Sequence, residues 1–309
     1  MKAVTLNDFD TAPVLREEPA PTPASNEVLV RVRASSVNPA DNSIAAGMLK
    51  QMGVEYEFPV ILGRDYTGVV EQVGSDVKRY RVGDTVFGFL LHANPTAHEG
   101  SWAELIAVPQ DMFIGRTPKG VDVAITGAAP LAGITALLAI DALELSDGDT
   151  VLIVGATGGV GSLAVQLAAR AGATVIAPAL AEDEAYLREL GVSELLPRDG
   201  DLAAAARDQH PDGFDAVLDL VNYAPDVPAS LAKEGGRVAS PTGAAGEGPG
   251  RTHVMAAPTP ENLERLARLL ADGTLRVHIQ ETYELAQAPD ALTALATTHT
   301  QGKLAIRVA

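Results

Sequence analysis

The chain has 309 residues, enough for two domains with cores of their own, and its 47% hydrophobic and 20% charged residues are typical of a soluble globular protein. A formal net charge of −17 argues against nucleic acid and anionic membranes as partners. Cysteine is absent, which excludes disulfides, thiolate zinc sites, iron–sulfur clusters and cysteine nucleophiles.

The first 120 residues carry the pattern of a mainly β domain. Short segments rich in β-branched residues alternate apolar and polar positions and are separated by Gly, Pro and Asp. The sequence starts directly with a strand-like segment, and no apolar run approaches the roughly 20 residues that span a bilayer. We therefore expect a cytoplasmic protein without a signal peptide or membrane span. The strands expected in this part are 27–34, 67–73, 84–89 and 102–108.

Residues 150–171 carry the strongest local signal in the chain. The apolar run Thr150–Val154 predicts a strand buried on both faces, as in a parallel sheet. A glycine-rich turn at 155–161 follows, and the next residues have the apolar spacing of an amphipathic helix. A strand, a glycine turn and a helix in this order direct unpaired backbone N–H groups toward a phosphate. A dinucleotide is the expected ligand.

The glycines of this turn have separate expected roles. Gly158 and Gly159 let a diphosphate approach the backbone, and Gly161 lets the helix pack close to the sheet. We expect the diphosphate over Gly158, Gly159, Val160 and Gly161, so a valine at Gly158 or Gly161 should weaken binding more than folding. Two other interpretations stay open: a glycine turn without a ligand, and a nucleophile elbow with Thr157 in place of serine.

Strands and helices alternate from residue 150 to residue 240, which indicates a doubly wound α/β region with a parallel sheet. The Gly- and Pro-rich stretch 241–250 predicts a loop beside the carboxyl edge of the sheet, either a lid or a plain surface loop. An amphipathic helix is expected at 261–271. The further strands expected are 174–177, 194–196, 215–220 and 237–240, and the further helices are 182–190, 202–208 and 226–233.

Several short motifs follow one another along nearly the whole chain. They occupy residues 37–41 (Val-Asn-Pro-Ala-Asp), 58–70, 82–88, 100–104, 129–136, 235–238 and 302–304. In this order they resemble the medium-chain dehydrogenase/reductase superfamily, and specifically its zinc-free quinone oxidoreductase branch. The resemblance implies a GroES-like, β-rich substrate domain from residues 1–122 and 258–309. It also implies a Rossmann nucleotide-binding domain from residues 123–257, and a homodimer.

The residues themselves support the zinc-free branch. Alcohol dehydrogenases of this superfamily hold a catalytic zinc with two cysteines and the histidine of a Gly-His-Glu motif. Gly63-Arg64-Asp65 stands at that place here, and the six histidines show no metal-ligand spacing, so no metal is expected. Without a Lewis acid, an unactivated alcohol is a poor hydride donor to a nicotinamide. A conjugated carbonyl is reduced more easily, because hydrogen-bond donors alone can stabilise the enolate charge.

The sequence therefore predicts a zinc-independent NAD(P)H-dependent oxidoreductase that transfers hydride to a small-molecule quinone or α,β-unsaturated carbonyl. The alternative is a protein that keeps the fold but has lost or repurposed its cofactor site, as a non-redox biosynthetic enzyme or a binding protein. The reason for this alternative is the sequence at 178–186, which departs from the pattern that cofactor-binding members of the family usually have.

The resemblance also implies roles for single residues. Asn38 and Asp41 are expected near the nicotinamide, Thr135 is expected to contact its phosphate or ribose, and Ser240 and Thr242 are expected to flank the same end. The alternatives are purely structural roles. Asn38 would then be a turn residue, and Thr135 would form a hydrogen bond to the backbone of its own helix.

Two assignments depend on weaker signals. Lys303, in Gly-Lys-Leu, is a further candidate cofactor residue, with a solvated surface lysine as the alternative. Tyr56 and Tyr66 are candidate proton donors or oxyanion partners, although a buried tyrosine more often packs with its hydroxyl engaged. Arg64 could steady an enolate, or it could form a structural ion pair with Asp65 or Glu71.

The choice between NADPH and NADH stays open. The resemblance favours NADPH, whose 2′-phosphate is usually held by a serine and a lysine after the second Rossmann strand. Here Glu182, Asp183 and Glu184 follow that strand and would repel a phosphate. The acidic residue expected for NADH falls at Pro178, which has no side-chain hydrogen-bonding group, and Arg198 could supply a positive charge.

Overall fold

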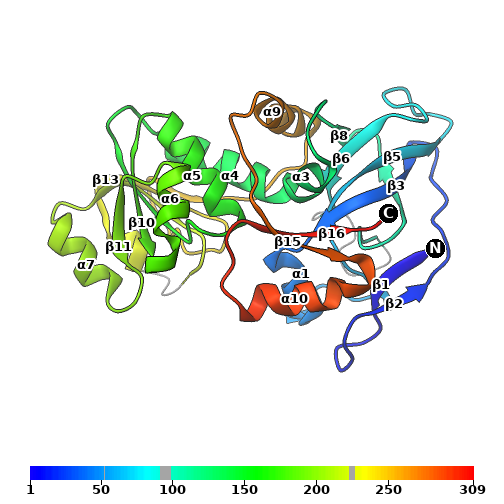
Figure 1. Cartoon of the computed structure of the whole chain (residues 1–309), viewed down its shortest axis with the longest axis horizontal. Coiled ribbons are helices and arrows are strands. Elements are labelled where there is room, and N and C mark those ends of the chain that lie inside the picture. Colours follow the sequence, from blue (N-terminus) through cyan, green and yellow to red (C-terminus); the bar gives the residue numbers. More distant parts are fainter. Residues whose placement is uncertain (52, 91–98, 223–226) are drawn as a thin grey trace. The chain divides into compact units, whose positions relative to one another are not determined.

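A computed structural model describes residues 1–51, 53–90, 99–222 and 227–309 (Figure 1). The chain forms two compact units: unit 1 contains Met1–Leu131, Pro258–Gly273 and Val277–Ala309, and unit 2 contains Ala132–Ala257 and Thr274–Arg276. The predicted α/β class is confirmed, with a β-rich unit drawn from both ends of the sequence and a parallel sheet in the other unit. Residues 123–131, expected in the nucleotide-binding domain, lie in unit 1.

Unit 1 is built on two sheets. The larger sheet has the order β15-β16-β3-β5-β6-β8, with β7 also paired to β3, and the smaller has the order β2-β1-β4. All pairings are antiparallel except that of β15 with β16. The strands are β1 (Lys2–Leu6), β2 (Val14–Glu17), β3 (Glu27–Ser36), β4 (Val60–Ile61), β5 (Asp65–Val73), β6 (Thr85–Phe89), β7 (Leu105–Pro109), β8 (Gly115–Arg116), β15 (Ile279–Glu284) and β16 (Lys303–Arg307).

The long strand β3 shows why this unit forms from the sequence. Its alternating residues Val28, Val30 and Val32 are fully buried in one core cluster, as the period of two predicts. A second core cluster surrounds the buried Trp102, whose indole N–H donates to the Ser36 carbonyl at 3.1 Å. The helices of unit 1 are α1 (Pro39–Ala45), α2 (Met48–Gln51), α3 (Val123–Ala128), α9 (Pro260–Ala271) and α10 (Ala288–Thr297), with a 3₁₀ turn η2 (Leu285–Gln287).

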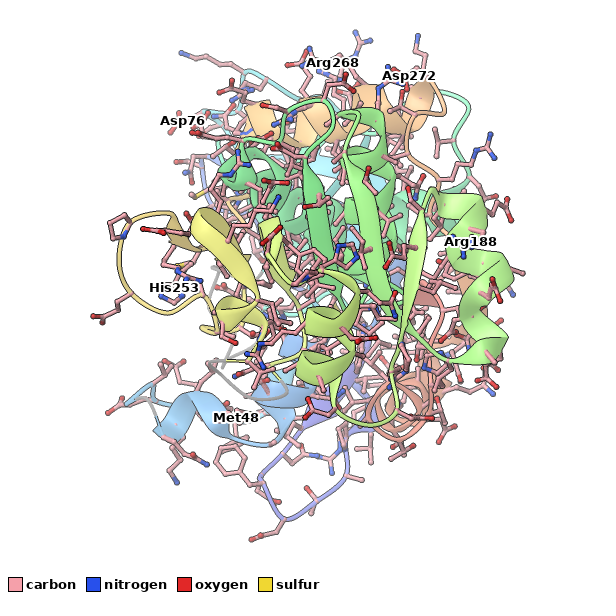
Figure 2. The ribbon with its side chains drawn as sticks, turned by 90° about the vertical axis from the view of Figure 1, so that its left-hand side faces the viewer. Met48, Asp76, Arg188, His253, Arg268 and Asp272 are labelled. Atoms are coloured by element: carbon pink, nitrogen blue, oxygen red, sulfur yellow. The ribbon has the colours of Figure 1, made fainter. Side chains whose placement is uncertain are left out.

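Unit 2 contains a six-stranded sheet in the order β11-β10-β9-β12-β13-β14, and every pairing in it is parallel. In Figure 2, His253 of β14 marks one edge of this sheet, and Arg188 lies on α6, toward the other. The strands are β9 (Thr150–Val154), β10 (Thr174–Ala179), β11 (Glu194–Pro197), β12 (Phe214–Asp219), β13 (Ala232–Ser240) and β14 (Arg251–His253). The helices are α4 (Pro130–Leu143, which starts in unit 1), α5 (Gly159–Arg170), α6 (Glu184–Leu190), α7 (Leu202–Gln209) and α8 (Val227–Ser230), with a 3₁₀ turn η1 (Ala181–Asp183).

The central strand β9 and helix α5 match the predicted elements closely, but the region after β12 differs. The helix expected at 226–233 is the short α8, and residue 226 lies outside the described residues. The helix stops because Ala232 pairs with Phe214 of β12, so β13 begins five residues before the expected strand. The edge strand β14 was not predicted. Within the described ranges, no helix is long and apolar enough to cross a bilayer.

Candidate functional site

The glycine turn of unit 2 ends in a helix N-terminus that has no side-chain cap. Gly155, at the end of β9, has a φ of +89°, which favours glycine, and Gly158 is the N-cap of α5. The first intrahelical bond runs from the Ser162 N–H to the Gly158 carbonyl at 2.8 Å. The N–H groups of Gly159, Val160 and Gly161 precede it and have no intrahelical acceptor. They form a donor group at the positive end of the helix dipole.

The two outer glycines of this turn differ in the space around them. A Cβ at Gly158 would meet only the Gly155 carbonyl oxygen, at 3.7 Å, so the approach to the amides is open. A Cβ at Gly161 would collide with the Gly155 carbonyl and lie 2.7 Å from the Ala156 Cα. The expectation that a valine at Gly161 acts mainly on binding is therefore wrong, because this glycine is needed for the turn to pack.

Ser240 and Thr242 form a turn at the end of β13. The buried Ser240 Oγ accepts hydrogen bonds from the N–H groups of Thr242, at 3.1 Å, and Ala244, at 3.3 Å, and it lies 2.9 Å from the Thr242 Oγ1. Thr242 itself is exposed. Because β9 and β13 are parallel, this turn and the glycine turn lie at the same carboxyl edge of the sheet. Thr135 is buried within α4.

A cavity of about 460 Å³ opens at the ends of β10 and β11, where the adenosine half of a dinucleotide is expected. Its lining includes Pro178, Arg198, Asp199 and Asp201, so one cation and two carboxylates share it. The Asp201 carboxylate accepts a hydrogen bond from the Ala204 N–H at 3.0 Å and caps α7, and the Arg198 N–H donates to the Ala179 carbonyl at 3.2 Å. The local charge is mixed and therefore favours neither NADPH nor NADH.

In unit 1, Asp65 is the centre of a buried polar cluster at the start of β5. Its Oδ1 accepts a hydrogen bond from the Leu131 N–H at 2.7 Å, and its Oδ2 accepts from the Ser36 hydroxyl at 2.7 Å and from the Asn38 Nδ2 at 2.8 Å. The sequence analysis did not single out Asp65 as a site residue. Its signal was its place in Gly-Arg-Asp, directly before the apolar run of a strand.

Asn38 and Lys303, predicted from opposite ends of the chain, meet in this cluster. The Lys303 Nζ donates to the Asn38 Oδ1 at 2.6 Å and to the Val37 carbonyl at 3.0 Å, and it lies 3.6 Å from the Asp65 Oδ2. Burial lowers the pKa of Lys303, and the neighbouring carboxylates oppose that shift. Lys303 is therefore not a solvated surface lysine. Its ammonium and both polar atoms of the Asn38 amide are engaged within unit 1.

Asp41 and Arg64 complete the cluster with a looser contact. The Asp41 Oδ2 accepts from the Asn38 N–H at 2.8 Å, whereas its Oδ1 lies 3.9 Å from the Arg64 Nε, an ion pair without a hydrogen bond. Both side chains are fully buried. Burial raises the pKa of Asp41 to about 6 and lowers that of Arg64 to about 10, with each opposite charge acting against the shift. Asp41 thus holds the start of α1.

Tyr66 lies away from this cluster, in the core around β3 and β5. It is fully buried, and its hydroxyl donates to the Phe113 carbonyl at 2.8 Å. Burial raises the pKa of this hydroxyl well above its usual value. The geometry is that of the packing alternative, and the catalytic assignment of Tyr66 stays a prediction.

The residues at the place of the Gly-His-Glu motif do not fit a zinc site. Arg64 is a cation and offers no lone pair, and its Nη2 donates to the Ile61 carbonyl at 2.8 Å. Both oxygens of the adjacent Asp65 already accept hydrogen bonds. In the described part of the chain, no group of three or more His, Asp and Glu side chains is placed to hold a metal ion.

Comparisons with known proteins agree with this fold. The alcohol dehydrogenase GroES-like domain family matches residues 24–119, and the zinc-binding dehydrogenase family matches residues 190–306. The chloroplast envelope quinone oxidoreductase homolog of Arabidopsis thaliana is 32% identical over 312 residues, covering 93% of this chain and 92% of that protein. The NADPH-dependent alkenal/one oxidoreductase of the same plant is 31% identical over 318 residues, covering 99% and 79%. The solved quinone oxidoreductase of Coxiella burnetii superposes with a TM-score of 0.89 at 29% identity, covering 100% and 99% of the two chains.

Proposed function

Because this chain belongs to the quinone oxidoreductase branch of the medium-chain dehydrogenase/reductase superfamily, we propose that it is a zinc-independent NAD(P)H-dependent reductase. Its substrate is a quinone or an α,β-unsaturated carbonyl compound. The observation that carries the proposal is the uncapped N-terminus of α5, where three backbone N–H groups stand at an open glycine turn. This is the donor set that a diphosphate requires. The relatives named for quinone and alkenal reduction support the substrate class.

Each part of the chain has a defined task in this proposal. The bound dinucleotide supplies the hydride. The amides of Gly159, Val160 and Gly161 bind its diphosphate, and the turn at Ser240 and Thr242 borders the same edge of the sheet. In unit 1, Asp65 and Lys303 fix the Asn38 amide, so we propose that Asn38 provides a rigid polar surface for the nicotinamide rather than a mobile donor. Protonation of the reduced product is left to solvent.

The experiment that tests the function combines binding and turnover. Purified protein is titrated with NADPH and NADH by fluorescence, and turnover is measured with a quinone, an enone and, as the matched control, the corresponding saturated alcohol with NADP⁺. We expect dinucleotide binding and turnover of the conjugated carbonyls only. Absence of binding at millimolar concentration of either dinucleotide would favour the alternative, a protein with a lost or repurposed site. A Thr157→Ala variant that lost all activity would instead favour a nucleophile elbow.

The preference between the two dinucleotides is a finer proposal, and it depends on Arg198. Among the described residues that line the cavity at the ends of β10 and β11, Arg198 is the cation that a 2′-phosphate would meet. Arg198→Gln should weaken NADPH binding about tenfold and leave NADH binding unchanged, because only NADPH carries the charge that Arg198 would pair with. Asp199→Asn is the matched control and should strengthen NADPH binding. Equal effects on both dinucleotides would contradict a role in phosphate recognition.

We also propose a homodimer that forms through strand β14. Among the described strands, β14 pairs only with β13, which leaves its outer edge available for another chain. Met255, two residues beyond β14, has a large apolar side chain that is 70% exposed, and a partner chain on β14 would cover it. Met255→Glu should shift the protein toward the monomer in light scattering, whereas Met112→Glu, an exposed methionine of unit 1, should not.

A further inference from the structure

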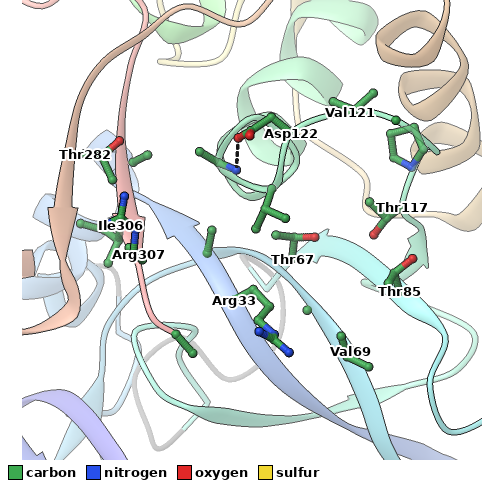
Figure 3. A pocket seen from close by; sticks show the side chains of 18 of the residues that line it. Arg33, Thr67, Val69, Thr85, Thr117, Val121, Asp122, Thr282, Ile306 and Arg307 are labelled. Carbon is green, nitrogen blue, oxygen red and sulfur yellow. Dashed lines mark hydrogen bonds between the residues drawn. The ribbon is translucent and has the colours of Figure 1, made fainter.

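Unit 1 contains a cavity of about 620 Å³ that none of the site residues above lines (Figure 3). The strands β3, β5 and β6 contribute one side of it, and β15 and β16 contribute another. The segment 117–122 and the first residues of α3 close the remaining side. Its size falls in the range of small-molecule sites.

One buried polar atom on the lining of this cavity lacks a hydrogen-bond partner among the described groups. The Thr67 hydroxyl, within the cavity, donates to the Val86 carbonyl at 3.1 Å and accepts from the Thr126 hydroxyl at 3.2 Å, so it is satisfied. The Thr117 Oγ1 is buried and makes no hydrogen bond to any other described group. A buried hydroxyl without a partner is unfavourable, and an acceptor atom of a ligand would satisfy it.

The charges around the cavity point to an anion. Arg33 and Lys119 line it and are exposed, and their side chains form no hydrogen bond or ion pair with another described residue. The other charged side chains of the lining are engaged: Arg307 pairs with Glu284 at 2.7 Å, and the Asp122 carboxylate accepts from the Ala124 N–H at 2.8 Å.

We propose that this cavity is a second ligand site, and that it takes a small organic carboxylate with an apolar body. Arg33 and Lys119 attract the carboxylate, and the Thr117 hydroxyl donates to it. The apolar body packs against Val69, Val121 and Ile306, which line the same cavity. A bare inorganic anion would leave that apolar surface in contact with water, so an amphipathic ligand fits better.

The test uses 2-naphthoate as the probe, with 2-naphthamide as its neutral isostere and inorganic phosphate as the bare anion. Calorimetric titration of the full chain without dinucleotide should show 2-naphthoate binding at least about tenfold more tightly than the other two. Arg33→Gln and Lys119→Gln should each weaken it about threefold to tenfold. Arg170→Gln, which removes an exposed cation from unit 2, should leave the affinity unchanged.

A third variant separates a ligand contact from a structural role. Thr117→Val should weaken 2-naphthoate binding several-fold without lowering Tm, because the protein itself gives this hydroxyl no partner. Equal affinity for the acid and its amide would overturn the proposal. So would phosphate binding as tightly as 2-naphthoate, no binding at 10 mM (about the limit of the titration), or affinities that Arg33→Gln and Lys119→Gln do not change.

Discussion

The polar groups of the two units are arranged in opposite ways. In unit 1, Asp65, Lys303 and Asn38 are fully or almost fully buried, and their polar atoms are bonded to one another or to the backbone of the same unit. In unit 2, Gly159 and Val160 at the start of α5 are half-buried and Gly161 is buried, and their amides have neither a side-chain cap nor an intrahelical acceptor. The polar atoms of Asp65, Lys303 and Asn38 are satisfied within unit 1, whereas the amides at the start of α5 are left for a ligand or for water.

This difference separates the consequences of substitution in the two regions. A buried polar cluster that is closed on itself contributes to folding, and removing one member leaves another without a partner. An open donor group contributes little to folding, because water satisfies it when no ligand is bound. Changes in the unit 1 cluster should therefore act first on the free energy of unfolding, and changes at the unit 2 turn should act first on dinucleotide affinity.

The largest effect on stability is expected from Arg64→Met. The variant removes a buried cation and leaves the Asp41 carboxylate buried 3.9 Å from the vacated charge, so we expect a loss of about 3–5 kcal/mol in the free energy of unfolding. The double variant Arg64→Met/Asp41→Asn should recover part of this loss, because it removes both charges. The measurement is urea denaturation of the full chain.

The matched control for Arg64→Met is an ion pair of the same unit that is partly exposed. Arg31→Met removes a cation that is hydrogen-bonded to Glu71 across β3 and β5, and both side chains are partly exposed. A pair of this kind is worth about 0–1 kcal/mol. If Arg31→Met destabilised the protein as much as Arg64→Met, burial would not be the cause of the larger effect.

Local patterns and long-range packing explain what could be predicted from the sequence. The strand at Thr150–Val154 and the helix after it were predicted almost to the residue, because their apolar periodicity is a local property. The cluster around Asp65 joins residues 36, 38, 65, 131 and 303. Most of these residues are far apart in the sequence, so no local pattern could predict their contacts. For the same reason, the need for glycine at residue 161 became visible only once the carbonyl of Gly155 was placed beside it.

Gly158→Val tests whether the glycine turn of unit 2 acts on dinucleotide binding rather than on folding. The φ of Gly158 is −73°, which any residue adopts, and its Cβ position faces open space, so folding should change by no more than about 1 kcal/mol. The valine would occupy the space of the diphosphate, and the affinity for NADPH should fall at least about a hundredfold, which corresponds to about 3 kcal/mol. Fluorescence titration and urea denaturation measure the two quantities.

Gly161→Ala is the counterpart three residues along the same turn. Its added Cβ collides with the Gly155 carbonyl, so the free energy of unfolding should fall by about 1–3 kcal/mol. If Gly158→Val proved as destabilising as Gly161→Ala, the turn would not be open at Gly158 and the contrast between the units would fail.

The pH dependence of stability tests the closed cluster through Asp41. Burial raises the pKa of this carboxyl from 3.8 to about 6, so between these values the folded chain binds more protons than the unfolded chain. The contribution of Asp41 is therefore fully present below pH 3.8 and is lost as the pH rises through about 6. Relative to Asp41→Asn, the wild-type free energy of unfolding should fall by about 2–3 kcal/mol between pH 4 and pH 7. A difference that stayed constant or rose with pH would contradict the burial of an ionisable carboxyl at this position.

Tyr66→Phe has the smallest expected effect, and it distinguishes a packing role of this tyrosine from a role as proton donor. Removing a hydroxyl that donates to the Phe113 carbonyl in a closed core should cost about 1 kcal/mol of stability, because the carbonyl loses its partner. Turnover should stay within about twofold of wild type, since a fully buried hydroxyl with a raised pKa is not a ready proton donor. Tyr80→Phe is the control, because its hydroxyl donates to the Ile114 carbonyl in the same core. A hundredfold loss of kcat in Tyr66→Phe alone, with Tyr80→Phe unaffected, would mean that Tyr66 reaches the reacting atoms and that the core of unit 1 is not closed around it.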